Sequence, residues 1–211
     1  MKRSSGFAVL AVIASLGGAC ASVPAEALYT LNAGLRGGVV RRDEGSPAGA
    51  ATPARGRSVL VEPPALPELI DRPQLVLRTG PERVVLLDQE RWAEPLRAQI
   101  ARVVAEDLEA LLGDWPIATS EDVLVAPACR VNLDVRRFEA ARTGPAVSDV
   151  LWRVTCGGVA RTGHAAAAEP VVGGTAGGAP DGGFAPVVAA HGRALDRLSR
   201  DLAAALREAA R

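Results

Sequence analysis

The chain has 211 residues, with 24 Lys+Arg against 24 Asp+Glu, 48% hydrophobic residues and only 3% aromatic residues. The even charge balance and the few aromatic rings argue against a nucleic-acid-binding protein, which needs clustered basic residues and stacking platforms. The hydrophobic fraction is too high for an intrinsically disordered chain. The length fits one domain with additional segments.

The N-terminus has the pattern of a bacterial export signal. A basic start, Met1 to Arg3, precedes an apolar run over residues 7–16, and small residues then lead to Cys20. The run is too short to cross a membrane, which takes roughly 20 apolar residues. We therefore predict a cleaved signal peptide over residues 1–19.

Cys20 is the predicted lipidation site, because small residues that end in a cysteine after an apolar run resemble a lipobox. Gly17 stands where a lipobox usually has leucine, and Leu16 lies one place further back. The alternative is ordinary signal-peptidase cleavage among these small residues. Ala21 follows the cysteine in place of aspartate, which fits sorting to the outer membrane. Without the two basic residues of the signal, the remainder is slightly acidic, so acyl chains such as palmitate, rather than charge, are expected to hold it at a membrane.

Residues 20–57 are predicted to be a lipid-anchored segment and flexible tether. A short extended stretch at residues 29–31 is followed by sequence rich in Gly, Ala, Pro and Arg, which is typical of linkers.

Residues 58–211 form the predicted folded domain. Apolar residues at helical spacing predict amphipathic helices from 95 to 112 and from 185 or 187 to 209. Phe138 breaks the alternation of its strand, which indicates a bulge or a strand end. This order predicts a single α+β domain, with a mostly antiparallel or mixed sheet packed by two amphipathic helices. Alternating apolar residues and turn residues predict the strands, over 57–62, 74–78, 83–88, 115–119, 130–139, 149–155 and 161–169.

Two further cysteines, Cys129 and Cys156, lie near the ends of strands that we expect to be neighbours. In an oxidising periplasm they could form a disulfide. The alternative is two buried free thiols, which pack as small hydrophobic groups, and this is the alternative that we favour.

The sequence contains no catalytic constellation or metal motif. Glu106 and Asp107 are adjacent on a predicted helix, so they point to different faces and cannot converge on one substrate. His164 and His191 lack the spacing of metal ligands, and His191 lies on an apolar helix stripe as a core histidine would. We therefore expect no enzyme activity, no metal and no cofactor.

Two segments rich in Pro, Arg, Trp and acidic residues are candidate partner contacts. They supply Asp71, Arg72, Gln74, Arg91 and Trp92. Trp92 has two alternative roles. It could close the start of the helix onto the preceding hairpin, which we favour, or it could be an exposed anchor for a partner.

Several of these segments together resemble the PqiC/YmbA-type lipoprotein family, the auxiliary lipoprotein components of MCE-type ABC transport systems. The resemblance covers most of the chain between Tyr29 and Leu206. Its motifs are YTL at residues 29–31, VLV at 59–61 running into Leu-Pro at 66–67, DRPQLV at 71–76, RWAEPL at 91–96 and AEDL at 105–108.

The resemblance implies an outer-membrane lipoprotein that faces the periplasm and docks the transporter without catalysing a reaction. Its implied partners are an MCE-domain protein and an inner-membrane permease, with further copies of the chain as another candidate. The rival hypothesis is an envelope lipoprotein that carries a lipid or other apolar ligand between the helices and the sheet and needs no transporter. A purely structural envelope lipoprotein is a third alternative.

Overall fold

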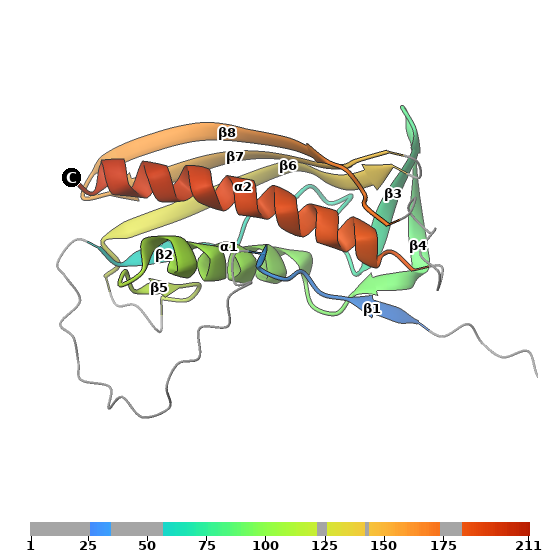
Figure 1. Ribbon diagram of the computed structural model, residues 1–211, viewed down its shortest axis with the longest axis horizontal. Coiled ribbons are helices and arrows are strands. Elements are labelled where there is room, and N and C mark those ends of the chain that lie inside the picture. Colours follow the sequence, from blue (N-terminus) through green and yellow to red (C-terminus); the bar gives the residue numbers. More distant parts are fainter. Residues whose placement is uncertain (1–25, 35–56, 122–125, 142–143, 174–182) are drawn as a thin grey trace, which may run out of the picture.

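The computed structural model describes residues 26–34, 57–121, 126–141, 144–173 and 183–211 (Figure 1). The predicted signal peptide and Cys20 lie outside these residues. The helices are α1, Leu96–Leu112, and α2, Ala185–Ala209. The strands are β1 (Ala27–Tyr29), β2 (Val59–Val61), β3 (Gln74–Gly80), β4 (Arg83–Trp92), β5 (Ile117–Ala118), β6 (Cys129–Ala141), β7 (Ala146–Cys156) and β8 (Val159–Glu169).

The eight strands form one mixed sheet, which confirms the predicted α+β class. Its order is β1-β4-β3-β6-β2-β5, and β7 pairs with both β6 and β8. Strand β6 organises the sheet because it is long enough to pair in parallel with β2 at its start and with β3 at its end. Its other edge pairs antiparallel with β7 along most of its length. The curled sheet and the two helices enclose one hydrophobic core (Figure 1).

The alternation of β6 determines which of its side chains enter the core. Val131, Leu133 and Val135 are buried, and the residues between them are exposed. The register against β7 shifts between Val135 and Arg137. This irregularity confirms the predicted bulge, and it is why Phe138 also points into the core.

The two helices bury the apolar stripes that their spacing predicts. Ile100 and Leu108 of α1 are fully buried, as are Leu202 and Leu206 of α2. Within the described residues no helix is long and apolar enough to span a bilayer.

Residues 26–34, which belong to the predicted anchored segment and the start of the tether, pack against the domain. β1 pairs in parallel with the end of β4. Leu31 is fully buried, and its N–H donates to Oε1 of Gln99 at 2.7 Å. Arg102 donates to the carbonyl of Leu31 at 2.8 Å, and the N–H of Gly34 donates to Asp196 at 3.2 Å. The rest of the predicted anchored segment and tether, residues 20–25 and 35–56, lies outside the described residues.

Candidate functional site

The candidate partner contacts meet around the start of α1, where the 66–72 connection, β3, β4 and β1 come together. The Asp71 carboxylate forms a two-point ion pair with the Arg97 guanidinium, including a hydrogen bond from Nε to Oδ1 of 3.2 Å. The hydrogen bond to Asp71 raises the pKa of Arg97 above its usual value. Arg72 donates to the carbonyl of Glu68 at 3.0 Å and closes the turn before β3. The Asp71–Arg97 pair fixes the connection onto the first turn of α1, and the Arg72 contact closes the connection on itself.

Arg91 and Gln74 lie opposite each other at the start of the β3–β4 pairing. The Nε of Arg91 lies 2.6 Å from the carboxylate of Glu26, and the two side chains are 39% and 45% exposed. This exposed pair joins β4 to the residue just before β1. Gln74 lines a small internal cavity. These side chains therefore have structural contacts, while Arg91 also remains accessible to a partner.

Trp92 packs inside the domain near the start of α1, as the structural alternative for this residue predicts. Its side chain is only 8% exposed, and its ring packs at 6.4 Å and 48° from the ring of Phe138. Its backbone N–H donates to the carbonyl of Pro73 at 2.7 Å. The ring of Trp92 is therefore not the exposed aromatic group that the second alternative requires.

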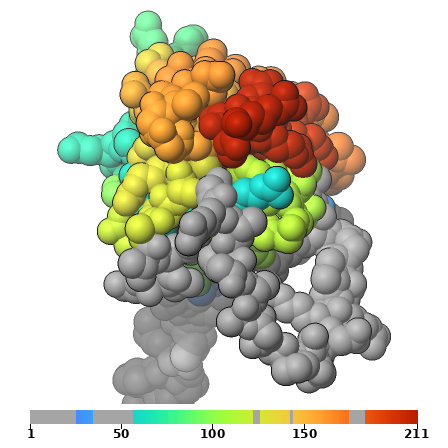
Figure 2. Space-filling view, turned by 90° about the vertical axis from the view of Figure 1, so that its left-hand side faces the viewer, coloured from blue at the N-terminus to red at the C-terminus, as the bar shows by residue number. Residues whose placement is uncertain are grey.

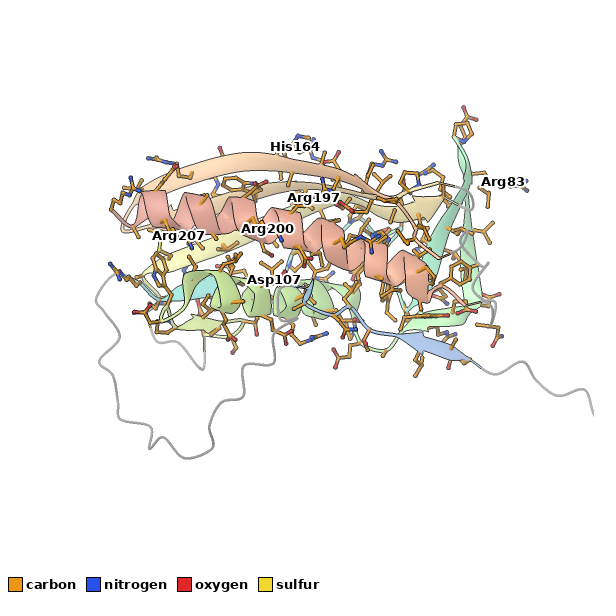
Figure 3. All side chains as sticks on the ribbon, in the orientation of Figure 1. Arg83, Asp107, His164, Arg197, Arg200 and Arg207 are labelled. Carbon is orange, nitrogen blue, oxygen red and sulfur yellow. A yellow bond between two sulfur atoms is a disulfide. The ribbon has the colours of Figure 1, made fainter. Side chains whose placement is uncertain are left out.

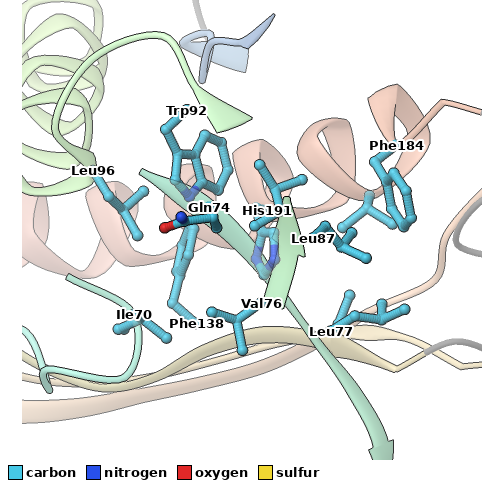
Figure 4. A pocket seen from close by; sticks show the side chains of 13 residues that line it. Ile70, Gln74, Val76, Leu77, Leu87, Trp92, Leu96, Phe138, Phe184 and His191 are labelled. Atoms are coloured by element: carbon cyan, nitrogen blue, oxygen red, sulfur yellow. The ribbon is translucent and has the colours of Figure 1, made fainter. Parts of the chain in front are cut away.

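Behind Trp92 lies an apolar cavity of about 20 Å³ (Figure 4). His191 of α2 forms part of its wall and stacks on Phe138, with ring centroids 4.0 Å apart and planes inclined by 18°. Burial lowers the pKa of His191 to about 3, although the charge of Glu139 acts in the opposite direction. The ring is therefore neutral at physiological pH, as expected for a core histidine. The cavity has room for about one water molecule.

Glu139 is a buried carboxylate that the sequence analysis did not single out. Arg78 of β3 binds both of its oxygens at 2.8 Å, and Arg137 donates to Oε1 at 2.9 Å. Burial alone would raise the pKa of Glu139, but the hydrogen bonds from the two arginines outweigh it and lower the pKa. This cluster links β3 to β6. A sequence signal existed, since a carboxylate directly follows the predicted bulge.

Between the helices, Asp107 of α1 is also fully buried, and Ser199 of α2 donates to its Oδ2 at 3.1 Å (Figure 3). Glu106, its neighbour, lies on another face, where its carboxylate pairs with Arg102 at 3.3 Å. The two carboxylates do not converge, as the sequence indicates.

Cys129 and Cys156 lie at the opposite end of the domain from the β3–β4 hairpin. They face each other across β6 and β7 and are joined by a disulfide, with Cα atoms 4.2 Å apart. Both side chains are buried. The structure therefore has the bonded pair, not the free thiols that we favoured from the sequence.

Two larger hollows open at the surface. One, of about 370 Å³, lies between α2 and the edge strand β8, and another, of about 800 Å³, lies on the outer side of β6 to β8. His164 borders both, and its Nε2 lies 2.8 Å from Asp149. Across the described ranges, no three His, Cys, Asp or Glu side chains gather as a metal site requires.

A solved structure shares this fold. A protein described only as uncharacterized has a TM-score of 0.62 and 19% sequence identity, over 85% of this chain and 97% of that one. Protein XCC0632 from Xanthomonas campestris has a TM-score of 0.49 and 22% identity, over 72% of this chain and 84% of that one. No functionally curated protein shows significant sequence similarity to the chain.

The family comparison agrees with the resemblance given by the sequence motifs. Residues 43–203 match the model of the ABC-type transport auxiliary lipoprotein component family. The match spans more than half of the chain and includes α1, β6 to β8 and most of α2. The chain belongs to the family of ABC-type transport auxiliary lipoprotein components.

Proposed function

We propose that the chain is an outer-membrane lipoprotein that faces the periplasm and serves as the non-catalytic auxiliary component of an MCE-type lipid transport system. The observation that carries this proposal is the family match over residues 43–203. In this role the domain docks the transporter at the outer membrane. Its partners are the MCE-domain protein and the inner-membrane permease of the same system.

The proposed processing follows from the sequence pattern. Residues 1–19 are the signal peptide, and Cys20 becomes the acylated N-terminus. The auxiliary domain occupies residues 58–211, to which the structure adds residues 26–34. Acyl chains on Cys20 supply the membrane attachment, because no basic surplus is present to hold an anionic surface.

The core beside His191 has no room for a carried lipid. The cavity beside His191 holds about 20 Å³, which is close to the size of one water molecule and far below that of an acyl chain. The space between α2 and the sheet at this point is filled by side chains. The rival hypothesis therefore has no support beside His191, and the hollow of about 370 Å³ between α2 and β8 is where it would place an apolar ligand.

The anchor is tested by membrane fractionation of the full-length protein in its native host. We expect Cys20→Ala to leave the outer-membrane fraction and to lose transport. The matched variant Ala21→Asp keeps the acylated cysteine but changes the residue that follows it, and we expect it in the inner membrane. A Cys20→Ala protein that stays in the outer membrane and supports transport would contradict the proposal.

A further inference from the structure

We infer that the end of the domain formed by β1 and the β3–β4 hairpin faces the lipid surface, and that exposed apolar side chains at this end contact it. The inference rests on the proposed anchor at Cys20 and goes beyond it by assigning an orientation. It is carried by where the described chain begins, by the short distance to the anchor, and by where large apolar side chains are exposed.

The first observation is that the chain is fixed to the domain from Glu26 onward. The Glu26 carboxylate pairs with Arg91 at 2.6 Å, and β1 follows immediately in parallel pairing with β4. The fully buried Leu31 then ties the segment to Gln99 and Arg102 of α1. The chain toward the anchor therefore leaves the domain at the start of β1.

The second observation is the length of chain between this point and Cys20. Only six peptide units separate Cys20 from Glu26, and at ~3.3–3.6 Å each they reach at most about 20 Å. Helix α2 has 25 residues and is therefore about 37 Å long. It runs along the long axis of the molecule, and its C-terminal end lies away from β1 (Figure 1). An anchor on Cys20 therefore keeps the start of β1 within about 20 Å of the bilayer, whereas the far end can lie further away than this reach.

The third observation is the character of the surface at the β1 end. Leu28 of β1 is 62% exposed, and Val85 and Leu86 of β4 are 37% and 36% exposed. Val172, which is 70% exposed, follows β8 at the end of the molecule where α2 begins. Arg83 extends from the tip of the hairpin (Figure 3). Apolar side chains combined with an arginine, whose aliphatic stem can lie in lipid while its charge stays at the interface, suit a membrane surface.

The opposite end provides the natural comparison. It is formed by the β7–β8 turn, the start of β6 and the C-terminus of α2 (Figure 2). Among the described residues it carries the disulfide and one exposed large apolar side chain, Val159, which is 44% exposed. In this orientation it points into the periplasm, where a partner of the transport system can reach it.

The test measures which end of the domain meets lipid. The chain from Cys20 to Arg211 is coupled through its Cys20 thiol to maleimide lipid, in vesicles of phosphatidylethanolamine and phosphatidylglycerol. Azidophenylalanine at position 86 or 172 carries an environment-sensitive fluorophore. Position 159 is the control at the opposite end, and its 44% exposure is similar to the 36% of position 86. We expect brominated acyl chains to quench the fluorophore at 86 or 172 at least twofold more than at 159.

Equal quenching at the two ends, stronger quenching at 159, or no quenching at any position would overturn the inference. Circular dichroism of each labelled protein confirms that it is folded. Because the coupling is chemical, the result does not depend on whether cells acylate Cys20. Fractionation tests whether Cys20 anchors the protein in cells, and the vesicle experiment tests which end of the domain a tether at Cys20 brings to lipid, so the two failures are distinguishable.

Discussion

The buried His191 predicts a specific loss of stability in mild acid. Burial lowers its folded-state pKa to about 3, whereas an unfolded histidine titrates near 6.5. Between these values the unfolded chain binds the proton and the folded chain does not, so the free energy of unfolding falls as the pH falls. pH 5 lies about 1.5 units below the pKa of the unfolded histidine, and each unit lowers the free energy of unfolding by about 1.4 kcal/mol. The expected cost relative to pH 8 is therefore about 2 kcal/mol, a substantial part of a typical total of ~5–15 kcal/mol.

Urea unfolding between pH 8 and pH 5 measures this cost for the wild type and for His191→Leu, which has a similar volume and no titrating group. The pH range of the experiment ends at pH 5. Glu139 has a lowered pKa and takes up its proton only below this range, so it does not contribute to the measured change. We expect His191→Leu to lose most of the pH dependence. His164→Leu removes the other histidine, whose side chain is 53% exposed, and is expected to keep the dependence that His191 causes. A wild-type slope that persists unchanged in His191→Leu would refute the assignment.

Three further predictions concern the sheet. Cys156→Ser opens a disulfide that spans 27 residues, and chain entropy predicts a loss of about 3–4 kcal/mol in denaturant unfolding; an unchanged midpoint would exclude the bond. Gly163→Ala places a Cβ against the Trp152 ring. The loss of melting temperature that Gly163→Ala causes should therefore be smaller in a Trp152→Ala protein than in the wild type, and an equal loss in the two backgrounds would contradict the contact. In β8, Ala167→Pro should lower the melting temperature more than Ala166→Pro, and the reverse order would show a different register.

The expected difference between the two proline variants follows from the turn that joins β7 to β8. Gly157 and Gly158 both have positive φ, of 53° and 88°, as the two central residues of a type I′ hairpin turn do. The pair that closes such a turn is hydrogen-bonded, so odd-numbered residues of β8 bond to β7 and even-numbered residues direct their backbone N–H to the free edge. Proline at 167 therefore removes a ladder hydrogen bond, while proline at 166 does not.

The two helices and most strands could be predicted because their signals are local. The α1 stripe around Ile100 and Leu108 repeats at helical spacing over 17 residues, and β6 alternates until its bulge. The core position of His191 followed from the same periodicity. These patterns depend only on which residues of one element are buried.

The attachment of residues 26–34 could not be predicted in the same way. β1 has only three residues, too few for a periodic pattern. The segment is held by contacts of Leu31 with Gln99 and Arg102, about 70 residues later in the chain. The disulfide had the same difficulty, because it requires Cys129 and Cys156 to be in register across two strands. The charge of Glu139 likewise becomes acceptable in the core only once Arg78 reaches it from β3.

The central claim is that the chain works as the auxiliary component of a transport system, and co-purification tests it most directly. The acylated full-length protein is purified from its native envelope in mild detergent, and the bound proteins are identified against those encoded by the neighbouring genes. The account predicts that an MCE-domain protein and an inner-membrane permease co-purify with it. Recovery of phospholipid with neither protein, from envelopes that contain both, would contradict the account and favour an independent lipid-binding lipoprotein.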